Sequence, residues 1–157
     1  LKRYQMELRN FIERVKFDYP ISVTLTEKEK IYGYENYRFY IDEIRSVRNT
    51  KHFLNRLNQM IFKNSFRRFN KKLKSFVVME GTSKNHHIHL ILDKPHRISY
   101  EEFCYLIDHC WSKTNFGNSH TYIQKITSNG WLNYITKYRS KTEFLTDIDW
   151  ENTYIGS

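Results

Sequence analysis

The stretch FVVMEGTSKNHHIHLILDK, residues 76–94, contains two apolar runs separated by a short polar segment. Residues 75–80 (SFVVME) and 87–92 (HIHLIL) are rich in the β-branched and apolar side chains that are typical of strands. Residues 81–86 begin with glycine and are few enough to join the runs as an antiparallel hairpin. We therefore expect this hairpin at the centre of a sheet.

Upstream of the hairpin, the sequence predicts two helices and a strand. Residues 1–17 and 40–69 have apolar positions at intervals of three and four, which indicates amphipathic helices, the second with a break near Asn49. Residues 21–27 form a β-branched run between them, which indicates a strand.

Downstream, Ser99 and Glu102 form a capping box in front of a helical stripe. Residues 119–126 alternate in the manner of a strand, and residues 129–141 return to helical spacing. The complete order contains the βαββαβ pattern of an α+β, ferredoxin-like or RRM-like antiparallel sheet. An N-terminal helix and a C-terminal, tyrosine-bearing helix are added to it. We expect a single domain over residues 1–157, with helices on one face of the sheet and the other face free for a ligand.

The charge of the chain favours a polyanionic partner. Its 26 Lys and Arg residues exceed its 17 Asp and Glu residues, which leaves a net charge of +9. Basic and aromatic residues alternate in residues 62–76, a mixture that suits single-stranded nucleic acid and equally an ordinary amphipathic helix. The candidate phosphate contacts, chosen by charge and neighbourhood, are Arg67, Arg68, Lys71, Lys72, Lys84 and Lys125.

Composition also limits the compartment. Cys104 and Cys110 have neither the spacing of a zinc ribbon nor that of a disulfide framework, so reduced thiols are expected. No apolar run approaches the roughly 20 residues of a membrane span. The sequence thus predicts a cytoplasmic protein without a membrane partner.

The hairpin carries a candidate metal site. Alternate residues of a strand share a face, so His87 and His89 project together while Ile88 and Leu90 enter the core. Glu80 ends the neighbouring strand, where its carboxylate can reach the imidazoles. Two imidazoles and one carboxylate form the open site of a catalytic metal, although such histidines also occur simply as solvent-facing polar residues.

The identity of the metal follows from two opposing arguments. Intrinsic affinity favours zinc or copper, whereas availability and phosphate co-ligands favour Mg²⁺ or Mn²⁺, which we expect. His86 is interpreted as a turn residue or a DNA contact.

The C-terminal helical segment carries candidate nucleophiles. Tyr134 and Tyr138 lie one turn apart on the predicted helix, with Lys137 beside them. A tyrosine hydroxyl, with a pKa near about 10, attacks only with help from a cation or from a metal-polarised target. The alternative is that these aromatic residues belong to the stripe that packs on the sheet.

Three segments occur in the order found in one enzyme family. They are SVTLT (Ser22 to Thr26), HIH (His87 to His89) and YITK (Tyr134 to Lys137). Through them the chain resembles the HUH endonucleases, specifically rolling-circle replication initiators, over residues 21–141. Glu80 stands where the third metal ligand of that family usually lies.

The resemblance implies a metal-dependent, site-specific endonuclease that nicks single-stranded DNA at an origin hairpin or nick site. Tyr134 would form a covalent 5′-phosphotyrosine intermediate, and Lys137 would contact a phosphate or stabilise the phenolate. Tyr138 has the spacing of the second nucleophile in two-tyrosine phage initiators. Host or viral replication proteins would be partners in the cytoplasm of the host cell.

Three alternatives remain open from the sequence. Single-strand DNA transposases of the HUH type share the chemistry, but they often take their third ligand, a glutamine, from the position that Tyr138 holds here. A non-catalytic ferredoxin-like module that binds RNA or single-stranded DNA fits the charge equally well. A binder of acidic membranes is the third. Residues 27–74 are longer than a minimal initiator requires, and no phosphate-binding loop of a helicase is present.

Overall fold

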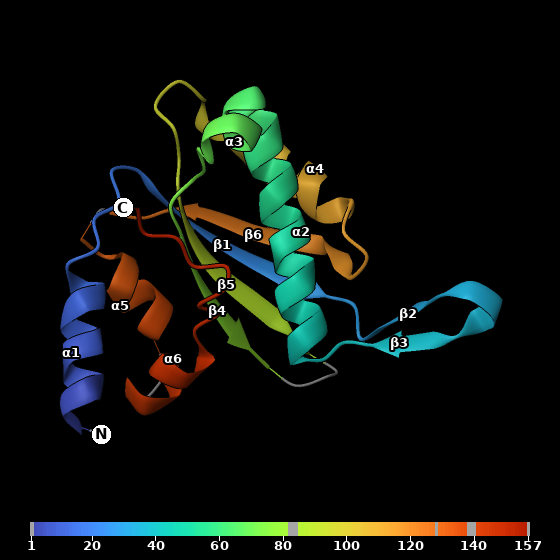
Figure 1. Cartoon of the computed structure of the whole chain (residues 1–157), viewed down its shortest axis with the longest axis horizontal. Coiled ribbons are helices and arrows are strands. Elements are labelled where there is room, and N and C mark those ends of the chain that lie inside the picture. Colours follow the sequence, from blue (N-terminus) through green and yellow to red (C-terminus); the bar gives the residue numbers. More distant parts are fainter. Residues whose placement is uncertain (1, 82–84, 128, 138–140, 157) are drawn as a thin grey trace.

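The computed structural model describes residues 2–81, 85–127, 129–137 and 141–156. In this part of the chain, the main sheet has the order β4-β5-β1-β6, and every neighbouring pair is antiparallel (Figure 1). Its strands are β1 (Pro20–Glu27), β4 (Ser75–Glu80), β5 (His87–Asp93) and β6 (Gly117–Lys125). This order confirms the predicted ferredoxin-like fold and the central hairpin.

One face of the sheet is covered by α2 (Glu43–Phe62) and α4 (Tyr100–Ser112). Both helices begin at a side-chain cap: Asp42 accepts from the backbone N–H of Arg45, and Ser99 accepts from that of Glu102, as the capping box predicts. Phe53 of α2 and Trp111 of α4 are fully buried and meet edge to face, with ring centroids 5.6 Å apart. The main core therefore lies on this side.

The opposite face is half covered, which corrects the expectation that it is free. Helices α1 (Lys2–Glu13), α5 (Trp131–Thr136) and α6 (Lys141–Asp147) lie over β4 and β5, where they form a second core around Phe76. The half formed by β1 and β6 stays open, since Tyr122 of β6 is 73% exposed there. A ligand can reach the sheet on that half.

Strands β2 (Lys30–Tyr32) and β3 (Arg38–Tyr40) form a ribbon that projects from the body of the molecule (Figure 1). A short 3₁₀ helix, η1 (Tyr34–Asn36), closes it, and Glu35 and Asn36 take left-handed backbone angles there. The ribbon accounts for part of the extra length between β1 and β4. The predicted helix over 40–69 therefore starts too early, because α2 begins at Glu43.

The break in the long helix also lies elsewhere. It falls at Lys63, whose φ is 51°, and the short α3 (Asn64–Phe69) follows. Asn49 stays helical because its amide is buried and bonded, accepting from the backbone N–H of Phe116. None of the helices in the described ranges is long and apolar enough to cross a membrane.

Candidate functional site

The structure brings Glu80, His87 and His89 together on the partly open face of the sheet. Glu80 pairs with His87 in the β4–β5 register, and Oε2 of Glu80 lies 2.6 Å from Nε2 of His89. Oγ1 of Thr24, on β1, lies 3.2 Å from Nδ1 of the same ring. The tautomer that satisfies both contacts accepts from the Thr24 hydroxyl and donates to Glu80. Ile88 is fully buried on the other face, as the alternation predicts.

The donor chemistry of these residues fits a divalent metal. Nδ1 of His87 is buried and has no hydrogen-bond partner among the described residues, although it is one residue pair away from the Glu80–His89 contact. Such a nitrogen normally costs about 1–3 kcal/mol unless something binds it. The side chains are not arranged as a metal cage, however: no group of three His, Cys, Asp or Glu side chains in the described part of the chain is positioned to hold an ion. The Glu80 carboxylate hydrogen-bonds to His89 instead.

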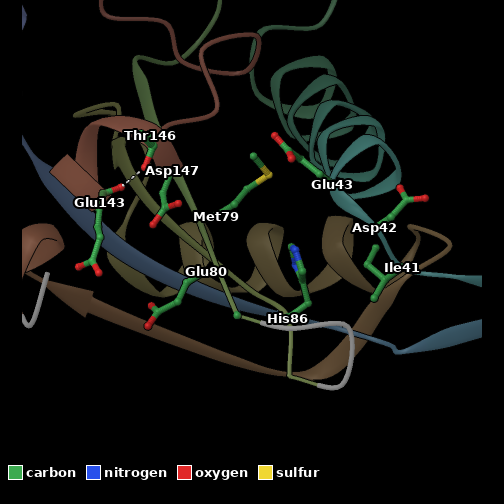
Figure 2. A pocket seen from close by; sticks show the side chains of 10 residues that line it. Ile41, Asp42, Glu43, Met79, Glu80, His86, Glu143, Thr146 and Asp147 are labelled. Atoms are coloured by element: carbon green, nitrogen blue, oxygen red, sulfur yellow. Dashed lines mark hydrogen bonds between the residues drawn. The ribbon is translucent and has the colours of Figure 1, made fainter. Parts of the chain in front are cut away.

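A pocket of about 710 Å³ opens beside Glu80 (Figure 2). Residues of the α2 N-terminus, the β4 end and α6 surround it, and its carboxylates come from Asp42, Glu43, Glu80, Glu143 and Asp147. His86 also lines it. In a chain of net charge +9, this local excess of negative charge attracts cations and repels phosphates.

A buried pair at the start of β5 was missed by the sequence reasoning. His86 lies in the loop before the strand, as expected, but its side chain is only 11% exposed, and its Nδ1 lies 2.9 Å from Oε1 of Glu27. Glu27 in turn accepts a 2.5 Å hydrogen bond from the Ser46 hydroxyl of α2. The pair thus links the first residue in front of the ligand strand to the main core.

Helix α5 places Tyr134 on the same sheet face as the proposed ligands. Trp131 anchors the helix, because its ring centroid lies 5.0 Å from that of Phe17 and 5.1 Å from that of Phe76. Ile135 is also buried, whereas Tyr134 is 36% exposed. The apolar stripe and the candidate nucleophile are therefore different residues of one helix, and Tyr134 is accessible.

The predicted helix over 129–141 is wrong in its extent. Helix α5 ends at Thr136, whose hydroxyl donates to the carbonyl of Leu132 at 2.7 Å, a side-chain bond that competes with helix continuation. Lys137 follows with an extended ψ of 130°, so it does not lie one helical position from Tyr134 as predicted. Tyr138 lies outside the described residues.

The model of one protein family, Replication-associated protein ORF2, matches residues 20–143. The chain belongs to this family. The match starts with β1 and ends within α6, so it includes Glu80, His87, His89 and Tyr134. Comparisons with curated proteins and with solved structures give no match. Family membership supports a Rep-type role in the initiation of DNA replication.

The structure places the candidate phosphate contacts of this replication-associated chain far from the proposed ligands. Arg67 and Arg68 belong to α3, and Lys71 and Lys72 precede β4, whereas Glu80 ends that strand. Five residue steps of about 3.3 Å separate the two ends of β4. Lys125 lies at the same remote end, where β6 pairs with Ile21.

Several of these cations also have internal aromatic partners. The Nζ atoms of Lys71, Lys72 and Lys125 lie 5.4, 4.4 and 4.5 Å from the ring centroids of Phe62, Tyr154 and Tyr100. Lys84 lies outside the described residues. If these residues bind DNA, they do so at a distance from the hairpin site.

Proposed function

We propose that the chain is a metal-dependent, site-specific single-stranded DNA endonuclease and strand transferase of the HUH type, which nicks DNA to initiate rolling-circle replication. The observation that carries the proposal is that the Tyr134 helix packs on the sheet face from which Glu80, His87 and His89 project. The family match to replication-associated proteins supports the biological role. Single-stranded DNA with an origin hairpin or nick site is the proposed substrate, with host or viral replication proteins as partners.

Glu80, His87 and His89 would hold Mg²⁺ or Mn²⁺. When bound, such an ion acts as a Lewis acid that polarises a phosphoryl oxygen. The hydrogen bond between Glu80 and His89 is compatible with this role, because a carboxylate and an imidazole that lack a shared cation share a proton instead. The Thr24 contact holds the His89 ring in one tautomer, which leaves Nε2 directed at Glu80.

Tyr134 would perform the covalent step. Its phenolic oxygen loses a proton and bonds to phosphorus, the bond from phosphorus to the 3′ oxygen breaks, and that oxygen takes up a proton. The products are a 5′-phosphotyrosine link and a free 3′-hydroxyl. One phosphodiester replaces another, so the reverse step rejoins the strand without ATP. Lys137, next to the end of α5, would contact a phosphate or stabilise the phenolate.

Tyr138 would be the second nucleophile of a two-tyrosine enzyme, a proposal that rests on its spacing from Tyr134 alone. The same chemistry would serve an HUH-type single-strand DNA transposase. A non-catalytic ferredoxin-like module for RNA or single-stranded DNA is the second candidate. It is favoured by Tyr122, which stands 73% exposed on the open half of the sheet, where a base can stack.

The decisive experiment detects the covalent adduct. The protein is incubated with a library of single-stranded oligonucleotides and Mn²⁺ and is then run on a denaturing gel. We expect an SDS-stable, shifted band that is lost in Tyr134→Phe and retained in Tyr105→Phe, a control at an exposed tyrosine on α4. A band that survives Tyr134→Phe but is lost in Tyr138→Phe reassigns the nucleophile.

Ligand variants separate catalysis from binding. His87→Ala and His89→Ala are expected to abolish the adduct while binding of the same oligonucleotides stays close to wild type, because phosphate contacts come from cations elsewhere. Tight binding by the wild type without an adduct on any oligonucleotide would refute the enzyme and favour the binding module.

A further inference from the structure

The projecting ribbon has no part in the chemistry proposed above, yet it carries an unusual density of exposed aromatic side chains. In the sequence YGYENYRFY, residues 32–40, Tyr32 is 60% exposed, Tyr34 is 86% exposed and Tyr37 is 69% exposed. A ribbon of two short strands gains little stability from side chains that point into water. Exposed aromatic clusters of this kind mark interaction surfaces.

Two adjoining hollows lie at the root of the ribbon. One, of about 420 Å³, lies between β3 and α2 and is lined by Phe39, Arg45, Arg48 and His52 among others. The guanidinium of Arg45 lies over the ring of Phe39, 5.5 Å from its centroid. The lining combines flat aromatic surface with cations.

The second hollow, of about 450 Å³, has the same character on the other side of Ile31, which lines both. It is bordered by Lys28, Lys30 and Tyr32. No carboxylate is among the described residues that line either hollow, in contrast to the acidic pocket beside Glu80. Together the two hollows form a continuous surface, which we call the ribbon groove.

We propose that the ribbon groove binds an unpaired stretch of DNA, with phosphates against Lys28, Lys30 and Arg48 and bases stacked on the ribbon tyrosines. Cations that follow a backbone and aromatic rings that accept bases are the two elements of single-strand binding. The positive charge of the groove argues against a second copy of the chain, whose net charge is also +9.

The position of the groove makes it useful to the proposed enzyme. Thr26, at the end of β1, pairs with His87, and the ribbon begins only a few residues further along the chain. The groove therefore lies at the end of the sheet where the proposed ligands lie, unlike the cations of α3 (Figure 1). The identity of the bound strand, namely DNA that flanks the nick site, rests on the proposed function.

The test measures the affinity for a fluorescein-labelled oligothymidine of about 20 nucleotides, long enough to cover a groove of this kind. Fluorescence anisotropy is recorded for the wild type, Tyr32→Ala and Arg48→Gln. Each substitution should raise Kd by roughly tenfold, and Arg48→Gln should also lower the slope of log Kd against log salt by about one. Matched controls are Tyr105→Ala on α4, where the side chain is 65% exposed, and Arg9→Gln on α1; both should stay within about twofold of wild type.

Three outcomes decide the inference. Wild-type affinity in both ribbon variants overturns it, even if the Tyr134 adduct forms and the proposed function stands. Weakened binding in variants with unchanged thermal midpoints supports it, even if no adduct is ever found and the nicking function fails. If Tyr32→Ala dissociates a dimer in analytical ultracentrifugation and leaves oligothymidine affinity unchanged, the groove binds a second copy and the proposal is overturned.

Discussion

Trp131 is the residue whose replacement tests whether the packing of α5 positions Tyr134. Its side chain is 4% exposed and makes ring contacts with Phe17 and Phe76. Each aromatic pair contributes about 0.5–1.5 kcal/mol beyond the burial of area. In Trp131→Leu both pairs are lost together with part of the buried surface, so we expect a loss of about 2–4 kcal/mol in unfolding free energy. For a chain of this size, that loss lowers Tm by roughly 5–15 °C.

The matched control is Phe53→Leu in the core on the other face. Phe53 is fully buried and loses a single ring contact, with Trp111, so the expected cost is about 1–2 kcal/mol. Urea unfolding measures both free energies. The initial rate of Tyr134 adduct formation is then measured well below the lower of the two Tm values, where both variants are folded.

We expect the adduct rate to fall at least tenfold in Trp131→Leu and to stay within about twofold of wild type in Phe53→Leu, because a nucleophile displaced by about 1 Å loses most of its advantage of position. Equal rates in the two variants would refute the reasoning that the second core positions the tyrosine. Equal losses in both would show that the adduct rate follows global stability.

Two further predictions concern local structure. Burial raises the pKa of the Cys110 thiol to about 11, so in native protein at pH 8 iodoacetamide should modify the partly exposed Cys104 first, as mass spectrometry will show; faster modification of Cys110 would contradict this burial. Because this pKa is above its unfolded value, its contribution to stability is complete below about pH 8.5 and is lost as pH rises toward the folded value. Gly81 has a φ of 105°, and a Cβ there would collide with the carbonyl oxygen of Asn85, so Gly81→Ala should reduce the urea midpoint by the equivalent of about 1–3 kcal/mol. An unchanged midpoint would show that the turn adapts to a side chain.

The central hairpin could be predicted from sequence because its signals are local. Side-chain alternation places Ile88 on one face and His87 and His89 on the other, whatever the rest of the chain does. A short connection then fixes which residue of β4 faces His87, and that residue is Glu80. The candidate metal ligands were therefore found from the same pattern as the strands.

The ribbon and the Glu27–His86 pair could not be predicted in the same way. Strands β2 and β3 have only a few residues each, too short for a periodic pattern, and their turn uses Glu35 and Asn36 in left-handed conformations where glycine would be the usual signal. The Glu27–His86 contact depends on the β1–β5 register, which is set by the fold as a whole. A register argument extended from the hairpin to β1 would have indicated it.

The distribution of charge around the sheet has a consequence for the path of DNA. The acidic pocket lies at the β4 edge, beside Glu80, whereas Asn115, which lines both hollows of the ribbon groove, immediately precedes β6 at the opposite edge. The carboxylates draw cations toward the proposed ligands and repel phosphates, and the groove has the reverse preference. A strand held in the groove would thus approach Tyr134 across the β1–β6 half of the sheet, which α1, α5 and α6 leave open and where Tyr122 is exposed. Metal and DNA would then reach the hairpin from opposite sides, so the strong positive charge needed for one partner does not exclude the other.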